Sequence, residues 1–285
     1  MRILVAVDTN PYSSYVVNEV GKMAINTWSD ITLLGILDPK KSTSKVEESD
    51  LAKSLLDFRE IITSYYPKGE CPYSREEIKS FSQIKDDVYV ATGKGGLKTL
   101  KIVIRKGINP VQEILNQADE DESTLIVLGC NKTNKCKWDD MDVPSKVANQ
   151  ASCSVLVVKE NKTPKQIVCC LDQEYITQNS LELINQMVTL YNAELKIVGV
   201  AEGESLKMRV ENTMKNLFMY YLKQDIPLWL EVINSSVFPN FVHQMSQDNL
   251  IAIWLGPKSF LKKFFPDEKI TTLISDAPSS VLLLR

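Results

Sequence analysis

The residues best placed to bind an anion lie in a polar loop that follows an apolar run. The run Leu125–Leu128 ends at Gly129, and the loop after it contains Lys132, Lys135 and Lys137. Three lysines could attract an anion such as a phosphate group. The same loop contains aspartates at positions 139, 140 and 142, so its net local field is close to neutral. The alternative is a lysine-rich loop that is simply solvated.

Two aspartates and a tryptophan could also contact a ligand. Asp8 follows the apolar run Arg2–Val7, and Asp172 follows a similar run later in the chain. A carboxylate at such a position either contacts a ligand or caps the next loop by accepting backbone N–H groups. Both interpretations stay open for Asp8, whereas the cap is favoured for Asp172. Trp138 either marks a contact surface or folds back to cover the loop.

Other patterns give weaker signals. Gly93–Gly96 resembles a phosphate-binding loop, but the strand-like segment Leu97–Ile104 follows it where a helix should begin, which favours a turn. The six cysteines form no CxxC pair, and three of them lie within or beside apolar strand runs, where a reduced cysteine behaves as a small hydrophobic residue. Cys130 and Cys136 flank the polar loop, and a redox pair is the alternative for them. The single histidine, His243, is expected to be structural, so no zinc site is expected.

A strand–loop–helix–strand unit positions the loop and occurs twice. Its first copy has strands at Leu125–Gly129 and Ser154–Val158, with a short helix between them at Pro144–Gln150. Residues Ile251–Leu284 repeat the same order of features. Apolar runs of this length, bounded by polar and turn residues, are typical of strands buried on both faces of a parallel sheet. The repetition predicts a duplicated domain.

The two predicted domains span residues 1–160 and 166–285, and each alternates strands with helices. The first contains an insertion at about Pro67–Leu97 that has no counterpart in the second. Within it, the charged segment Tyr73–Lys85 is predicted to be an exposed helix. The last strand of each half, Ser154–Val158 and Ser280–Leu284, lacks the charged or proline residues that protect a sheet edge. We therefore expect these two strands to pair, within one chain or across a dimer.

Composition excludes several classes of protein. The chain has 285 residues, 44% of them hydrophobic, and a formal net charge of −3. This composition is typical of a globular protein, and the charge gives no support to general nucleic-acid binding. No apolar run is long enough to cross a membrane, and no signal peptide is recognisable, so a cytoplasmic location is expected.

Each half resembles a universal stress protein domain, and the whole chain resembles a tandem member of that family. The resemblance rests on the strands that end at Asp8 and Asp172, the phrase Gly107–Pro110 before a helix, the segment Leu125–Gly129, and the ending Ala151–Val158. It implies an α/β fold with two doubly wound domains, each with a five-stranded parallel sheet of order 3-2-1-4-5. It also implies a ligand crevice at the carboxyl ends of the first and fourth strands, where Asp8 would contact a base or ribose.

Nucleotide-binding members of this family carry a loop of the form Gly-X2-Gly-X9-Gly followed by Ser or Thr, in which backbone N–H groups close around phosphates. Here Gly129 is present, but Lys132 takes the second position and the final pair falls near Met141–Asp142. In the second half Gly256 is kept, whereas Ser259 and the acidic pair at 267–268 replace the later positions. Carboxylates beside phosphates add repulsion unless a metal ion intervenes.

Both loops are therefore predicted to be degenerate. The candidate crevice residues are Asp8, Gly129, Asn131, Lys132 and Ser145. No cofactor is expected, with ATP or AMP as the alternatives. Because no acid/base pair, metal cluster or activated nucleophile is evident, we expect a stress-response protein that binds a ligand or protein and is not an enzyme. The alternatives are a nucleotide sensor that uses the first crevice and a weak ATPase of the same fold.

Overall fold

The computed structural model describes residues 1–40, 45–78, 80–130, 136–138, 141–159, 163–171, 176–201, 207–255, 261 and 267–285. The first half contains five parallel core strands: β1 (Arg2–Ala6), β2 (Asp30–Leu37), β5 (Leu100–Lys106), β6 (Leu125–Gly129) and β7 (Ser154–Val158). The second half repeats them as β8 (Gln166–Leu171), β9 (Glu194–Ala201), β10 (Leu228–Asn234), β11 (Leu250–Trp254) and β12 (Val281–Leu284).

The two halves share one strand order. It is β5-β2-β1-β6-β7 in the first half and β10-β9-β8-β11-β12 in the second, which is 3-2-1-4-5 in both. All of these pairings within each half are parallel. The predicted α/β architecture and its strand order are confirmed.

The last strands of the two halves pair with each other inside one chain. β12 runs antiparallel to β7, with Leu282 opposite Leu156, and this pairing joins the halves into one twelve-stranded sheet. The predicted pairing is confirmed in its intramolecular form. Each half covers the edge that would otherwise expose an apolar strand in the other.

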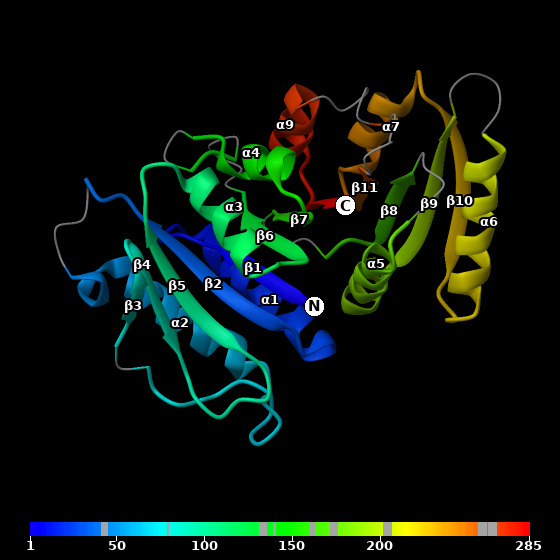
Figure 1. Ribbon diagram of the computed structural model, residues 1–285. Helices are drawn as coiled ribbons and strands as arrows, with labels where there is room; N and C mark the ends of the chain where they lie inside the picture. The colour runs from blue at the N-terminus through cyan, green and yellow to red at the C-terminus, as the bar shows by residue number, and fades with distance from the viewer. Residues whose placement is uncertain are drawn as a thin grey trace.

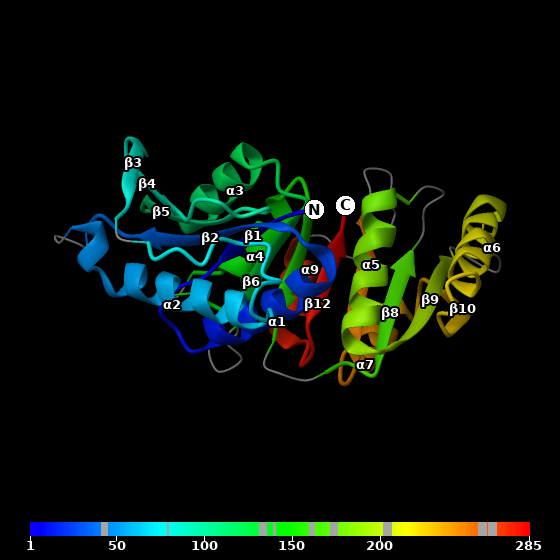
Figure 2. The ribbon, with the colours of Figure 1, turned by 90° about the horizontal axis from the view of Figure 1, so that it is seen from below.

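Eight helices among the described residues cover the two faces of the sheet (Figures 1 and 2). One face carries α1 (Tyr12–Thr27), α2 (Asp50–Ser64), α5 (Gln178–Tyr191) and α6 (Met208–Leu222). The other carries α3 (Pro110–Glu120), α4 (Val143–Gln150), α7 (Phe238–Met245) and α9 (Asp267–Asp276). A short 3-10 turn, η1 (Val46–Glu48), precedes α2. Each face has one apolar core that continues from the first half into the second.

Local residue chemistry starts several of these helices where the sequence places polar caps. The side chain of Ser49 accepts a hydrogen bond from the N–H of Ala52 at the start of α2, and Thr177 does the same for Ser180 at the start of α5. Such caps satisfy N–H groups that have no partner within the helix. None of the described helices is long and apolar enough to span a membrane.

A hydrogen bond also links the halves on the α1 face. The hydroxyl of Tyr191 on α5 donates to the carboxylate of Glu19 on α1. Burial of this hydroxyl, followed by the charge of Glu19, raises the pKa of Tyr191 well above its usual value.

The insertion differs from its prediction. The segment Tyr73–Lys85 is not a helix: its described residues are extended or irregular as far as β3 (Ser82–Lys85), which forms an antiparallel hairpin with β4 (Val88–Thr92). The guanidinium of Arg59 on α2 donates to the carbonyl groups of Ser74 and Glu76. These carbonyl groups therefore accept hydrogen bonds from Arg59 and not from the N–H groups of a helix. The charge pattern of the segment cannot reveal a donor that lies elsewhere in the chain.

The hairpin covers the outer side of β5, because β4 pairs antiparallel with it. The turn predicted at Gly93–Gly96 is confirmed, since it connects β4 to β5 and no helix follows it.

Candidate functional site

The position predicted for the crevice is the place where β1 and β6 end side by side. These strands are parallel neighbours, with Ala6 opposite Leu128, so Asp8 and Gly129 both lie at the carboxyl edge of the sheet. The fold thus brings these two candidates to the same edge of the sheet. Asn131 and Lys132 lie outside the described residues.

The carboxylate of Asp8 is fully engaged by its own loop. One of its oxygens accepts hydrogen bonds from the N–H of Asn10 at 2.9 Å and the hydroxyl of Ser13 at 2.8 Å. The other accepts the side-chain amide of Asn10 at 2.7 Å and the hydroxyl of Tyr12. This is the geometry of a loop cap at the start of α1, the second of the two interpretations that the sequence left open for Asp8.

Two aromatic side chains lie against Gly129. The ring of Tyr12 is so close that a Cβ atom at position 129 would lie 2.5 Å from its Cδ2 atom. The indole N–H of Trp138 donates to the carbonyl oxygen of Gly129 at 3.0 Å, and its ring lies 6.1 Å from that of Tyr12. Trp138 is only 7% exposed. It therefore packs back onto Gly129 and Tyr12 and is not an exposed contact surface.

Tyr12 was missed by the sequence analysis. It follows Asp8 by four residues, and the segment around it has the composition of a loop, yet α1 begins there. Its ring explains Gly129 without a ligand: a glycine is needed at this position because Tyr12 occupies the space that a side chain would fill.

The remaining first-half candidate, Ser145, is on the first turns of α4 and is 3% exposed. Its hydroxyl is thus not presented to solvent, as a phosphate contact would require. Asp142, at the N-cap of α4, makes no side-chain capping hydrogen bond.

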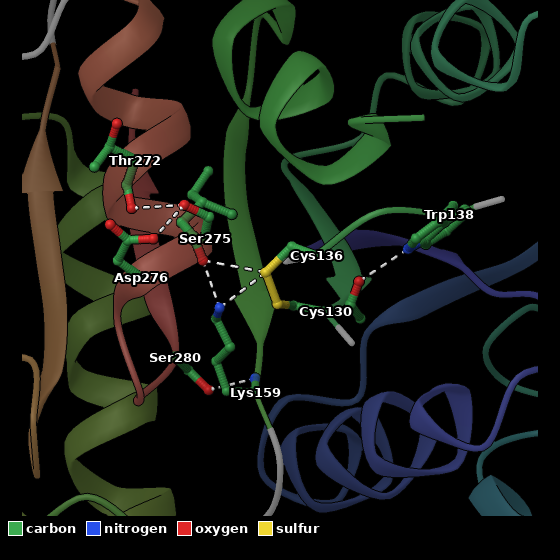
Figure 3. The surroundings of a disulfide bond; sticks show 10 residues. Cys130, Cys136, Trp138, Lys159, Thr272, Ser275, Asp276 and Ser280 are labelled. Atoms are coloured by element: carbon green, nitrogen blue, oxygen red, sulfur yellow. Dashed lines mark hydrogen bonds between the residues drawn. A yellow bond between two sulfur atoms is a disulfide. The ribbon is translucent and has the colours of Figure 1, made fainter. Parts of the chain in front are cut away.

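Beside the crevice, Cys130 and Cys136 form a disulfide bond, with their Cα atoms 4.4 Å apart (Figure 3). This pair was the alternative for the two cysteines that flank the loop. The ammonium of Lys159, at the end of β7, lies 2.9 Å from the sulfur of Cys136 and also donates to the carbonyl of Ile274 on α9. Lys159 was not a candidate in the sequence, because its contacts come from residues far from it along the chain.

The second half offers fewer described site residues. Asp172, Gly256 and Ser259 lie outside the described residues, and the acidic pair at 267–268 begins α9. His243, which was predicted to be structural, is exposed on α7. Within the described part of the chain, no group of three or more His, Cys, Asp or Glu side chains could hold a metal ion.

Comparisons with known proteins agree with the fold. A model of the Universal stress protein family matches residues 1–159. A universal stress protein from Archaeoglobus fulgidus DSM 4304 aligns with a TM-score of 0.63 and 14% identity over 100% of this chain and 96% of its own. A putative universal stress protein from Pseudomonas aeruginosa UCBPP-PA14 aligns with a TM-score of 0.60 and 14% identity, over 99% and 92% of the two chains.

A third similar structure is that of a cytoplasmic domain. The cytoplasmic domain of a prokaryotic cation chloride cotransporter aligns with a TM-score of 0.57 and 14% identity, over 99% of this chain and 94% of that domain. A comparison with curated proteins found no significant match. At these levels of identity the structural likenesses establish a shared fold alone.

Proposed function

Because this chain belongs to the universal stress protein family, we propose that it acts in a stress response by binding a protein or ligand, and that it does not turn over a substrate. Both nucleotide loops are degenerate in this proposal. The protein holds no cofactor, does not bind nucleic acid and does not insert into a membrane. A cytoplasmic location is part of the proposal.

The observation that carries the proposal is the pair of aromatic rings against Gly129. In a phosphate-binding loop, glycine lets the backbone approach a phosphate closely. Here the ring of Tyr12 takes up the space beside Gly129, and Trp138 donates to its carbonyl. A nucleotide would have to displace both rings and then compete with four hydrogen bonds for the carboxylate of Asp8.

Isothermal titration of the full chain with ATP and Mg²⁺, and separately with AMP, tests this proposal. We expect no saturable binding of ATP below about 10 μM. The Mg²⁺ is required in the titration because it could neutralise a nearby carboxylate. Tight ATP binding would refute the proposal and favour the sensor.

A nucleotide sensor is the second candidate, because Asp8 and Gly129 lie at the ends of neighbouring strands, as the family pattern requires. AMP binding that Asp8→Ala abolishes, without ATP binding, would support base recognition alone. A weak ATPase is the third candidate. Release of phosphate from ATP in proportion to the amount of this protein, unchanged after further purification, would support an ATPase.

For a partner, we propose self-association through the edge strand β10. It is the last strand at one end of the sheet, whereas its counterpart β5 is covered by β4. Three large apolar residues of β10 are exposed: Trp229, Leu230 and Val232. A second copy can pair with β10 antiparallel about a twofold axis, which would remove this edge from water.

Sedimentation of the chain at increasing concentration tests the association. We expect a dimer that Val232→Lys converts to a monomer, because a lysine on an edge strand disfavours pairing with a strand of a second copy. Leu97→Lys, at an exposed apolar position in the first half, is the matched control and should leave the dimer intact. A chain that stays monomeric at all concentrations would rule out this partner.

A further inference from the structure

The disulfide between Cys130 and Cys136 has a lysine ammonium beside one of its sulfurs. Figure 3 shows Lys159 pointing its ammonium at the sulfur of Cys136, 2.9 Å away. The N–H of Lys159 donates to the hydroxyl of Ser280 at 3.0 Å, and its ammonium donates to the carbonyl of Ile274. Lys159 is 3% exposed. Contacts from both halves of the chain therefore hold a buried cation against one sulfur of the pair.

This arrangement makes the two sulfurs unequal. An adjacent ammonium stabilises a thiolate and so favours departure of that sulfur when the disulfide is attacked. Among the residues that the structure describes, no second ammonium lies this close to the sulfur of Cys130. The asymmetry assigns Cys136 as the leaving sulfur and Cys130 as the sulfur that is attacked.

The backbone at Cys136 adds to this. Its φ angle is +62°, in the left-handed region, which is unfavourable for a residue with a side chain.

We propose that Cys130 and Cys136 form a thiol–disulfide exchange site, whose substrate is a dithiol and in which Lys159 stabilises the departing thiolate of Cys136. This goes beyond the proposed binding function and does not depend on it.

The exchange is balanced in two steps. One thiolate of the dithiol attacks the sulfur of Cys130, the bond to Cys136 breaks, and its electron pair stays on Cys136 beside Lys159. The second thiolate of the dithiol then attacks the sulfur now bonded to Cys130. This forms the disulfide of the small molecule and releases Cys130, which takes a proton from water. The protein gains two electrons and the dithiol loses two.

Equilibration of the native full chain with dithiothreitol tests the site. After acid quenching, alkylation and peptide mass spectrometry report the redox state of Cys130 and Cys136. A native pulse of the alkylating reagent runs in parallel, and the buried Cys169 and Cys170 must stay unlabelled in it. That control verifies that the chain did not unfold during reduction.

We expect the pair to be reduced while the chain stays folded, and to re-form when oxidised dithiothreitol is supplied. Lys159→Gln should slow reduction by roughly tenfold, because the departing thiolate loses its counter-charge. Lys159→Arg should restore most of the rate. Lys146→Gln, at an exposed position on α4, should leave the rate unchanged.

Three results would overturn the proposal. The first is reduction only after Cys169 and Cys170 become labelled, which would make the bond purely structural. The second is a pair that stays as thiols under the oxidant. The third is an unchanged rate in Lys159→Gln. If Lys159→Gln does not fold, the first two results still test the proposal. The reduction rate of Lys159→Arg then serves as the third test, and a roughly tenfold slower rate in that variant would overturn the proposal.

Discussion

At the scale of single residues, the crevice is organised by packing around Gly129. Tyr12 contacts both Gly129 and the carboxylate of Asp8, so it links the ends of β1 and β6. Trp138 closes the group through its hydrogen bond to Gly129. The residues that could bind a ligand here contact one another instead: Tyr12 bonds to Asp8 and packs on Gly129, and Trp138 bonds to Gly129.

This arrangement predicts a large effect of Trp138→Ala on stability. The variant loses a nearly buried indole and leaves the carbonyl of Gly129 without its donor. We expect the free energy of unfolding to fall by about 3 kcal/mol. Trp28→Ala, at an exposed position, should change it by less than about 0.5 kcal/mol. Urea denaturation measures both, and equal effects would show that Trp138 does not hold the crevice closed.

At the scale of elements, the β3–β4 hairpin covers β5 near one end of the sheet, whereas no described strand covers its counterpart β10 at the other end. Its approach to the sheet depends on side chains of α2 and on Tyr73, whose hydroxyl donates to the carbonyl of Ser29 at 2.6 Å. The strand-like path of the insertion is therefore set by contacts with elements that precede it in the chain.

Arg59→Met is predicted to loosen this insertion. Arg59 is buried, and its guanidinium donates to the carbonyls of Ser74 and Glu76. Without it those carbonyls lose their donors, and we expect a loss of about 1–3 kcal/mol. Lys53→Met, on the same helix but exposed, should be near neutral. Hydrogen exchange along Val88–Thr92 should accelerate in the first variant alone; unchanged exchange there would contradict the role of Arg59.

At the scale of the whole molecule, the antiparallel β7–β12 pair makes two similar halves into one structural unit. The sheet runs without a break from β10 to β3, and both apolar cores cross the junction. A contact between α1 and α5 reinforces the junction through Glu19 and Tyr191.

We therefore predict that the halves unfold together. Leu282 is fully buried opposite Leu156, and Leu282→Ala should lower the free energy of unfolding by about 2–5 kcal/mol while keeping a single transition. Fluorescence and circular dichroism should give coincident curves. Amides along β7 and β12 should exchange slowly. Two separate transitions, or rapid exchange along both strands, would contradict one continuous unit.

The raised pKa of Tyr191 predicts a loss of stability in alkali. Below the ordinary tyrosine pKa of about 10 the hydroxyl is neutral in both states, and its contribution is fully present. As the pH rises further, Tyr191 ionises in the unfolded chain before it does so in the folded one. The free energy of unfolding should then fall by up to about 1.4 kcal/mol per pH unit from this residue. Tyr191→Phe should show a shallower decline, and parallel pH profiles for the two chains would exclude this contribution.

The sequence alone determined the two α/β halves, their strand order and the pairing of their last strands. The two halves follow from the repeated apolar runs, and the pairing of the last strands follows from their unprotected edges. The strand order came from the resemblance to the universal stress protein family, and the structure decided that the last strands pair within one chain. It also placed Asp8 and Gly129 at one edge of the sheet, because parallel strands bring their carboxyl ends together. The family model, which matches residues 1–159, agrees with that reading.

Only the tertiary structure decided what these residues contact. Trp138 folds back onto Gly129, Arg59 draws the insertion away from a helix, and Ser145 is buried. Lys159 reaches the carbonyl of Ile274, which lies 115 residues further along the chain. Contacts between residues that are far apart in the sequence are set by packing and hydrogen bonding in the folded state. Sequence spacing carries no record of those contacts.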